Sequence, residues 1–187
     1  MKTYVLGDIH GAYRALTQVF ERSGFDAQKD RLIFLGDAVD GWSQSPESIE
    51  ELLKVKHLIH LLGNHDLWAL NWLLNGKRPA MWLEQGGLAT MEAYSRRDWR
   101  AKKGEHLDFL MKARLKFLDE ENRLFVHAGI DPMVPLDQQV ETDLIWDRTL
   151  FDRVGGVPDY RENFIGHTVT ITEGTDKTLQ FGEKDNA

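Results

Sequence analysis

Cysteine is absent from all 187 residues of the sequence. Without thiols the chain forms no disulfide bond, has no cysteine nucleophile and offers no thiolate ligand for zinc. This absence also suits a reducing compartment, so we expect a cytoplasmic protein. Proline is scarce, with 5 residues, and no Pro- or Ser-rich stretch marks a linker. A chain of this length fits one domain, and we expect a single domain over residues 1–187.

Long hydrophobic runs are missing as well. No stretch approaches the roughly 18 apolar residues of a membrane span. Near the amino terminus the apolar run ends at Leu6, directly before Gly7 and Asp8, so a signal peptide is not expected. The formal net charge of −7 lacks the basic excess that is typical of nucleic-acid-binding proteins. We therefore expect neither a membrane nor a nucleic acid as the main partner.

What the sequence does contain is a recurring unit of a short apolar run, a polar turn and a segment with helical spacing. The apolar runs predict strands over residues 4–6, 31–35, 57–62, 123–126 and 164–165. Helical spacing predicts helices over residues 16–20, 46–53 and 67–74. This alternation favours an α/β layered fold with a largely parallel sheet.

Residues 77–122 differ from the rest of the chain. They are rich in helix-forming residues, carry several Arg and Lys, and contain no strand followed by a polar turn. We interpret this segment as a helical insertion or cap beside the site. Its tryptophans, Trp82 and Trp99, are expected to pack in the core of the cap.

Five predicted strands are followed at once by Gly, Asp, Asn or His. In an open α/β sheet the carboxyl ends of the strands meet along one edge, so we expect these turns to converge. Oxygen and imidazole ligands without thiolates suit manganese, iron or zinc. Two such metals about 3.5–4 Å apart can hold a shared hydroxide and clamp a phosphoryl group. The candidate ligands are Asp8, His10, Asp37, Asn64, His127 and His167.

The order of these turns resembles the five motifs of the calcineurin-like metallophosphoesterase superfamily. The similarity is greatest to its phosphoprotein phosphatase branch, which includes the phage and bacterial serine/threonine phosphatases and the symmetrical diadenosine tetraphosphatases. The resemblance implies a four-layer α/β/β/α sandwich with the metals at one edge. The motifs are Gly7-Asp8-Ile9-His10-Gly11, Gly36-Asp37-Ala38-Val39-Asp40, Gly63-Asn64-His65-Asp66, His127-Ala128-Gly129 and Gly166-His167-Thr168.

The resemblance also implies a role for each motif residue. The first metal would be held by Asp8 and His10, and Asp37 would bridge to the second. The remaining ligands of the second metal would be Asn64, His127 and His167. Manganese is the expected metal, with iron or zinc as alternatives.

Three further residues acquire catalytic or substrate-binding roles from the resemblance. His65 would be the general acid that protonates the leaving oxygen. Asp40 would orient the imidazole of His65 and raise its pKa, because a nearby carboxylate favours the charged imidazolium. Arg148 resembles the phosphate-binding arginine of the phage-type phosphatases, and its planar guanidinium can engage two phosphate oxygens at once.

The motif glycines have a mechanical interpretation. Gly7, Gly36 and Gly63 lie where a strand must turn sharply to direct the next side chain at a metal. Glycine adopts positive φ angles without a steric penalty, so we expect positive φ at these positions.

The chain departs from the family pattern at several positions. Gly41 and Leu62 stand where many members of the branch have arginines, which leaves the preferred phosphate group open. Next to Gly41, Trp42 is a candidate for stacking on a base or an aromatic side chain. Fewer than 20 residues follow Thr168, so we expect that the last strands of the family fold are missing or that the tail replaces them.

These observations leave three functions open. The leading prediction is a metal-dependent phosphomonoesterase of the serine/threonine protein phosphatase type, which cleaves phosphate esters with a metal-bridging hydroxide. A symmetrical diadenosine tetraphosphatase or another nucleotide phosphohydrolase is the second. The third is a metal-binding scaffold without catalysis, against which the presence of both His65 and Asp40 argues.

Overall fold

The computed structural model describes residues 1–152, 157 and 159–169, and the chain divides into two units, Met1–Arg114 and Leu115–Ala187. Each unit has a sheet of its own. The predicted loss or replacement of the last strands concerns the tail after Thr168, which lies outside the described residues except for Val169.

The first unit is built on three parallel strands. These are β1 (Thr3–Leu6), β2 (Arg31–Phe34) and β3 (His57–His60), in the spatial order β1-β2-β3. The crossovers between them contain α1 (Tyr13–Ser23) and α2 (Ser45–Leu53). Two consecutive strand–helix–strand units therefore form the parallel sheet that the alternation of strand and helix predicts.

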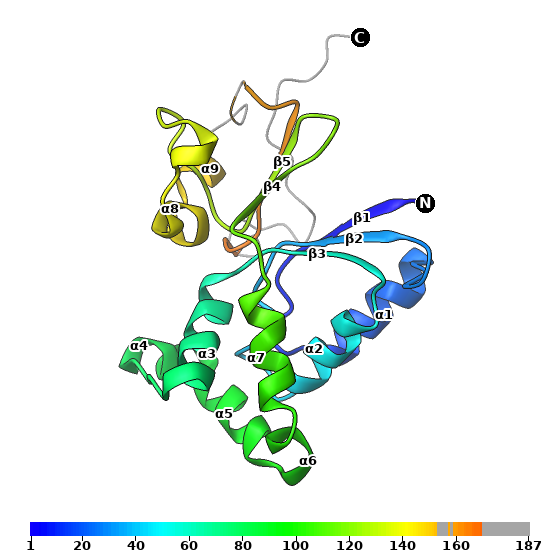
Figure 1. Ribbon diagram of the computed structural model, residues 1–187, viewed down its shortest axis with the longest axis vertical. Coiled ribbons are helices and arrows are strands. Elements are labelled where there is room, and N and C mark those ends of the chain that lie inside the picture. The colour runs from blue at the N-terminus through cyan, green and yellow to red at the C-terminus, as the bar shows by residue number, and fades with distance from the viewer. Residues whose placement is uncertain (153–156, 158, 170–187) are drawn as a thin grey trace. The chain divides into compact units, whose positions relative to one another are not determined.

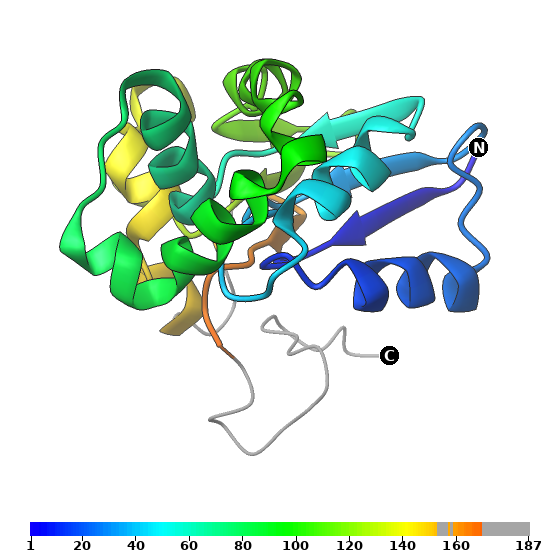
Figure 2. The same ribbon diagram turned by 90° about the horizontal axis from the view of Figure 1, so that it is seen from below.

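Both crossover helices cover the same face of this sheet, as Figures 1 and 2 show. The helices turn apolar side chains toward the central strand β2, in which Leu32, Ile33 and Phe34 are buried. The buried core joins Leu16 of α1, Leu32 and Phe34 of β2, and Ile49 and Leu52 of α2. Since β2 is the middle strand, this core holds the sheet together, and the carboxyl ends of its three parallel strands lie at one edge.

A helical segment follows β3. It consists of α3 (Asn64–Asn75), α4 (Ala80–Trp82), a π-helical turn (Leu83–Gly87), α5 (Leu88–Ser95), α6 (Arg97–Arg100) and α7 (Lys103–Met111). Figure 1 shows α7 beside α3, and these two helices contact each other. Helix α3 begins three residues earlier than the predicted start at residue 67, so the Gly-Asn-His motif forms its first turn.

The predicted helical insertion over residues 77–122 is helical only as far as Met111. Lys116–Leu118 is a strand, β4, which pairs antiparallel with β5 (Arg123–Val126). The Asp119 carboxylate stabilises the turn between them, since it accepts the main-chain N–H groups of Glu121 at 3.0 Å and Arg123 at 2.9 Å. A three-residue strand leaves too short an apolar pattern to recognise, and its pairing with β5 decides its structure.

Within the described part of the second unit, β6 (Glu162–Phe164) pairs parallel with β5. Helices α8 (Glu141–Trp146) and α9 (Thr149–Asp152) precede it, and a short 3-10 turn at Leu136–Gln138 lies before α8. Phe125 and Phe164 stack across the two strands with ring centroids 4.8 Å apart. Aromatic pairs of this kind stabilise neighbouring strands and here hold β6 in register.

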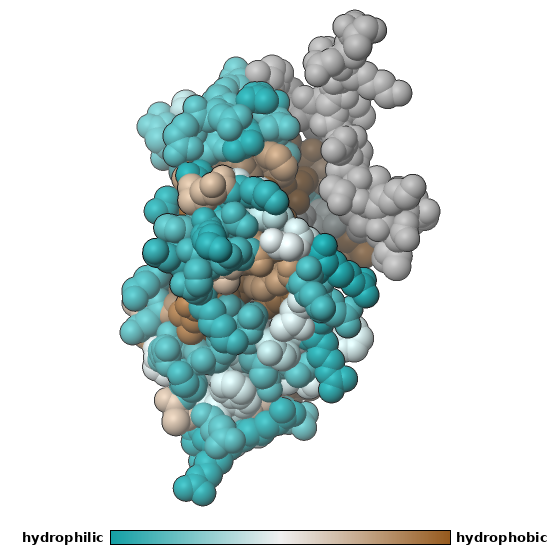
Figure 3. Space-filling view, turned by 90° about the vertical axis from the view of Figure 1, so that its right-hand side faces the viewer, coloured by the Kyte–Doolittle hydropathy of each residue, from teal (hydrophilic) through white to brown (hydrophobic). Residues whose placement is uncertain are grey.

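The surface fits the charged composition of the chain. The face drawn in Figure 3 is largely hydrophilic, with a smaller hydrophobic area between the polar side chains. Among the described residues, none of the helices combines the length and the apolar character that crossing a membrane requires.

Candidate metal and catalytic site

The carboxyl ends of β1 and β2 bring three predicted ligands of the first unit together. Asp8 and His10 follow β1, and Asp37 follows β2. The Nε2 atom of His10 lies 3.8 Å from Asp8 Oδ2 and 3.7 Å from Asp37 Oδ2. The turns after parallel strands therefore converge in this unit as predicted. Asn64 is buried at the start of α3, between Gly63 and His65, the residues whose main chains adjoin Asp37.

The ring of His10 has the orientation of a metal ligand. Its Nδ1 atom lies 3.2 Å from the carbonyl oxygen of Val39, so an N–H there can donate to that oxygen. A ring fixed in this way presents the lone pair of Nε2, the atom that lies between the Asp8 and Asp37 carboxylates. His10, Asp37 and His65 each offer a ligand atom, and these atoms lie within 4.8 Å of one another. One carboxylate and two imidazoles at this spacing, with the Asp8 carboxylate 3.8 Å from His10, fit a divalent cation.

Asp37 is held in place by a carboxylate to which the sequence analysis gave no role. Asp66, which is completely buried, accepts the main-chain N–H of Asp37 at 2.8 Å and that of Ala38 at 2.9 Å. The Asp37 carboxylate in turn accepts the main-chain N–H of His65 at 2.9 Å. Asp66 is the last residue of the third motif, and its burial behind the turn explains why a short acidic side chain stands there.

Three of the candidate site residues adopt the positive φ angles that were predicted for the glycines. His10, Asp37 and Asp40 have φ angles of 49°, 58° and 71°. Non-glycine residues rarely adopt this left-handed region, and such strain is concentrated at functional sites. Among the predicted glycines, Gly36 does have a positive φ, of 103°.

The prediction of positive φ is wrong for the other two motif glycines. Gly63 has a φ of −92°, and Gly7 is not among the residues with positive φ. The need for glycine at position 63 is one of space. A Cβ atom there would collide with the carboxylate and the main-chain nitrogen of Asp37. No such contact would arise at Gly7.

His65 and Asp40 form a hydrogen-bonded pair. The Nδ1 atom of His65 lies 2.8 Å from Oδ2 of Asp40, and the Asp40 side chain is completely buried. Burial by itself lowers the pKa of His65, but the hydrogen bond to Asp40 and the negative charges of Asp37 and Asp66 outweigh it and raise the pKa above its ordinary value. A protonated imidazole beside the candidate metal ligands can act as a general acid.

Two residues of the helical segment also contact Asp40, and the sequence analysis assigned neither of them to the site. Trp82 was predicted to pack, and it is indeed buried, but its indole N–H also donates to Asp40 Oδ2 at 2.6 Å. The hydroxyl of Thr90 donates to Asp40 Oδ1 at 2.7 Å. No sequence motif surrounds either residue, so only the folded chain reveals these contacts.

The second unit groups the remaining predicted residues. His127 follows β5 and is completely buried, while His167 follows β6 and has a φ of 62°. Their ring centroids lie 5.1 Å apart, and each ring offers a nitrogen within 4.8 Å of the other. Arg148 lies beside them, since its Nη1 donates to Thr168 Oγ1 at 3.0 Å and to the carbonyl oxygen of His167 at 3.4 Å. Its side chain is exposed.

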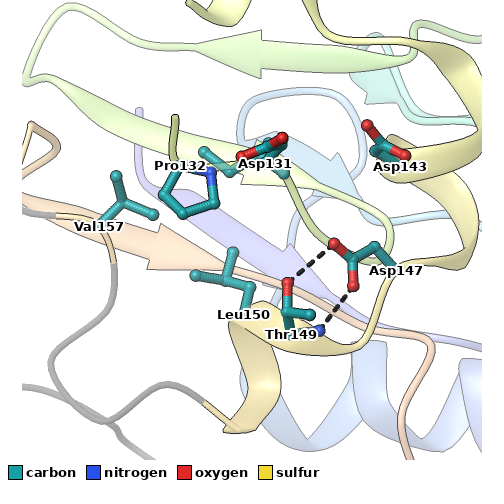
Figure 4. A pocket seen from close by; sticks show the side chains of 8 residues that line it. Asp131, Pro132, Asp143, Asp147, Thr149, Leu150 and Val157 are labelled. Carbon is teal, nitrogen blue, oxygen red and sulfur yellow. Dashed lines mark hydrogen bonds between the residues drawn. The ribbon is translucent and has the colours of Figure 1, made fainter. Parts of the chain in front are cut away.

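The second unit also contains a cavity of about 390 Å³, drawn in Figure 4. Asp131, Asp143 and Asp147 form its acidic side, and Asp147 accepts hydrogen bonds from the main-chain N–H of Thr149 at 2.7 Å and from its hydroxyl at 2.8 Å. No residue that the sequence analysis assigned to the site lines this cavity. It therefore does not correspond to the predicted site.

The model of the calcineurin-like phosphoesterase family matches residues 1–185. The chain belongs to this family. The family implies divalent metals, and the Asp and His side chains that the structure brings together could hold them.

Among curated proteins, a relative from Coxiella burnetii carries the name symmetrical bis(5'-nucleosyl)-tetraphosphatase. It is 34% identical over 142 residues, which are 74% of this chain and 45% of the relative. The chain thus spans about half the length of the curated relatives that it matches. The name of this relative favours the predicted alternative, a symmetrical diadenosine tetraphosphatase, and does not support the predicted serine/threonine phosphatase type.

Solved structures agree on the fold. A crystal structure described provisionally as a diadenosine tetraphosphatase has a TM-score of 0.59 at 25% identity, over 76% of this chain and 56% of that one. A metallophosphoesterase from Sphaerobacter thermophilus has a TM-score of 0.58 at 20% identity, over 89% of this chain and 59% of that one. The predicted metallophosphoesterase fold class is thereby confirmed.

Proposed function

We propose that this chain hydrolyses dinucleoside tetraphosphates such as diadenosine tetraphosphate, with symmetrical cleavage. The observation that carries the proposal is the grouping of Asp8, His10 and Asp37 with the His65–Asp40 pair close by. That grouping suits phosphoryl transfer to water. The names of the curated relatives supply the substrate class.

The metal ligands are part of the proposal. Asp8 and His10 would hold one ion, Asp37 would be shared, and Asn64, His127 and His167 would complete the second position, with manganese as the expected metal. Bound divalent ions would supply Lewis-acid polarisation of the phosphoryl group and a water activated as nucleophile. The carboxylates and imidazoles that the chain provides suit hard or borderline cations of this kind.

The protein's own groups would then manage the proton and the charge. His65, with its pKa raised, holds a proton on the ring nitrogen that does not contact Asp40, from which the leaving oxygen can take it. Arg148 carries a planar, permanently charged guanidinium, and Thr168 and the main chain of His167 hold one of its nitrogens. That group can engage the oxygens of a phosphate and neutralise charge as the bond breaks.

Trp42 favours a nucleotide over a phosphoprotein. Its side chain is 68% exposed, and its main-chain N–H donates to the carbonyl oxygen of His10 at 2.8 Å. An exposed indole whose main chain is fixed next to a candidate metal ligand can stack on a base. An uncharged indole offers no ionic contact to a phosphopeptide.

The test compares two substrates after removal of bound metal with a chelator and reconstitution with manganese. Symmetrical cleavage of diadenosine tetraphosphate releases two ADP, whereas asymmetrical cleavage releases ATP and AMP, so chromatography of the products identifies the bond that breaks. Phosphate release from a phosphothreonine peptide is measured in parallel. Two ADP with little peptide turnover would support the proposal. Preference for the peptide would overturn it, and Asp37→Asn is the inactive control.

A further inference from the structure

The carboxylate of Asp40 accepts hydrogen bonds from side chains that lie far from Asp40 in the sequence. Oδ2 accepts from His65 at 2.8 Å and from the indole N–H of Trp82 at 2.6 Å, and Oδ1 accepts from the hydroxyl of Thr90 at 2.7 Å. The side chains of Asp40, Trp82 and Thr90 are completely buried. A buried carboxylate needs such partners, because an unpaired one would lose several kcal/mol of hydration.

The hydrogen bonds around Thr90 have a single consistent direction. Its one hydroxyl proton is donated to Asp40, so both remaining lone pairs accept. One accepts the main-chain N–H of Asp40 at 2.9 Å, and the other accepts the hydroxyl of Ser45 at 3.0 Å. Thr90 thus contacts Asp40 at both its main chain and its side chain. This double contact opposes rotation of the carboxylate about its side-chain bonds.

Two glycines bring the helical segment close enough for these contacts. The π-helical turn contains Gly86, whose φ is 108°, and a Cβ atom there would collide with the main-chain nitrogen of Gly41. A Cβ atom on Gly87 would collide with the ring of Trp82. Gln85 and Gly86 have non-helical φ and ψ angles, so this turn is a kink between α4 and α5. The indole N–H of Trp82, directly before the kink, donates to Asp40.

We propose that Trp82 and Thr90 are positioning residues for the Asp40–His65 pair, and that the turn from α4 to α5 holds the Asp40 carboxylate in the one orientation that aligns His65. This inference rests on the proposed hydrolysis of the tetraphosphate, in which His65 is the acid. Asp40 has two oxygens and two side-chain torsions, so one hydrogen bond to His65 would leave its orientation free. The donors from the helical segment remove that freedom.

Removal of the hydrogen bond from Trp82 or from Thr90 to Asp40 should cause a selective kinetic defect. Trp82→Phe keeps an aromatic ring but removes the indole donor, and Thr90→Val keeps the shape of the side chain but removes the hydroxyl. Each should lower kcat roughly tenfold on a substrate with a poor leaving group, because general acid catalysis contributes about 10²–10⁴-fold and misalignment forfeits part of it. KM should change little, since neither residue is assigned to substrate binding.

The experiment uses the full chain with manganese and two phosphate monoesters, phenyl phosphate and p-nitrophenyl phosphate. Phenol is the poorer leaving group and depends more on the acid. The matched controls are Trp72→Phe and Ser48→Ala. The ring centroid of Trp72 lies 5.8 Å from that of Trp82, and the hydroxyl of Ser48 donates to the carbonyl oxygen of Gln44 at 3.0 Å. Loss of kcat that is larger for phenyl phosphate, and absent in the controls, supports the proposal. Equal losses on both esters, or equal losses in the controls, overturn it.

A second measurement separates this inference from the proposed function. Nuclear magnetic resonance of the metal-free chain observes the His65 ring directly, whether or not either ester is cleaved. A single set of His65 ring signals in the wild type that splits or broadens in Trp82→Phe and Thr90→Val supports a positioning role. Signals that are unchanged in both variants overturn it, even in a protein that proves to be an active tetraphosphatase. Failure of hydrolysis with altered His65 signals contradicts only the proposed function.

Discussion

The carboxylate of Asp66 accepts the main-chain N–H of Asp37 at 2.8 Å, so one acidic residue fixes the backbone of another. The same carboxylate accepts the main-chain N–H of Ala38 at 2.9 Å and that of Gly63 at 3.3 Å. It therefore joins the turn after β2 to the start of α3. In this way the fold holds the candidate bridging ligand in a backbone conformation that a non-glycine residue rarely adopts.

Asp66→Asn should weaken both folding and metal binding. One acceptor oxygen becomes an NH₂ group that faces main-chain N–H donors, so buried donors lose their partner at a cost of about 1–3 kcal/mol in the free energy of unfolding. Urea unfolding measures this loss, and calorimetric titration with manganese measures the weaker binding. Asp108→Asn, on the exposed side of α7, is the control and should change neither. Unchanged manganese affinity in Asp66→Asn would contradict the role of Asp66.

Gly63→Ala should destabilise the first unit, because the added methyl group would collide with Asp37. Overpacking of this kind costs typically about 1–3 kcal/mol in the free energy of unfolding. Gly104→Ala is the matched control. It lies in α7 with no atom within 4 Å of an added Cβ, and there alanine should stabilise by roughly 0.5–1 kcal/mol. Thermal unfolding of the two variants should shift in opposite directions, and a shift in the same direction would argue against the collision.

The stability of the chain should fall on mild acidification through His106. Its ring is completely buried, with Tyr94 hydrogen-bonded to Nδ1 at 2.5 Å and Glu50 to Nε2 at 2.9 Å. Burial lowers the pKa of His106 below the ordinary value of 6.5. The unfolded chain therefore binds a proton before the folded chain does. The stability is full above about pH 6.5 and is lost as the pH falls toward the lower folded pKa.

Urea unfolding at pH 7.5 and pH 5.5 tests this prediction. The wild type should lose more stability between the two values than His106→Gln, which lacks the titrating group. His57→Gln, at an exposed position on β3, is the matched control for replacing a histidine. The same pH dependence in His106→Gln as in the wild type would rule out His106 as the source.

Trp42→Ala tests base recognition. If the indole stacks on adenine, the variant should raise KM for diadenosine tetraphosphate by roughly tenfold, because stacking on an aromatic side chain contributes about 1–3 kcal/mol per base. KM for p-nitrophenyl phosphate, which has no base, should stay within twofold. Leu88→Ala is the control, since Leu88 is also exposed, at 59%, and belongs to α5. Equal changes on both substrates would count against stacking.

The sequence predicted the parts of the molecule that depend on local patterns. The strands of the first unit form at the predicted apolar runs, and Asp8, His10 and Asp37 converge because carboxyl ends of parallel strands lie at one edge. The His65–Asp40 hydrogen bond agrees with the role that the family resemblance implies. Metal binding by these residues and by His127 and His167 stays a prediction.

What the sequence did not predict depends on contacts between distant residues. Thr90 reaches Asp40 over 50 positions and Trp82 over 42, and no local pattern distinguishes a tryptophan that only packs from one that also donates a hydrogen bond. Strand β4 was missed because its pairing with β5 decides its structure. The need for glycine at position 63 arises from Asp37, which lies on another turn.

The order of the pairings along the chain bears on how a ribosome delivers this protein. Thr3 pairs with Arg31 and Arg31 with His57, so each new strand of the first sheet finds its neighbour already synthesised 28 or 26 residues earlier. Asp40 and His65 leave the ribosome before Trp82 and Thr90 do. A nascent chain therefore completes its sheet first, and the donors that align the proposed acid arrive only afterwards.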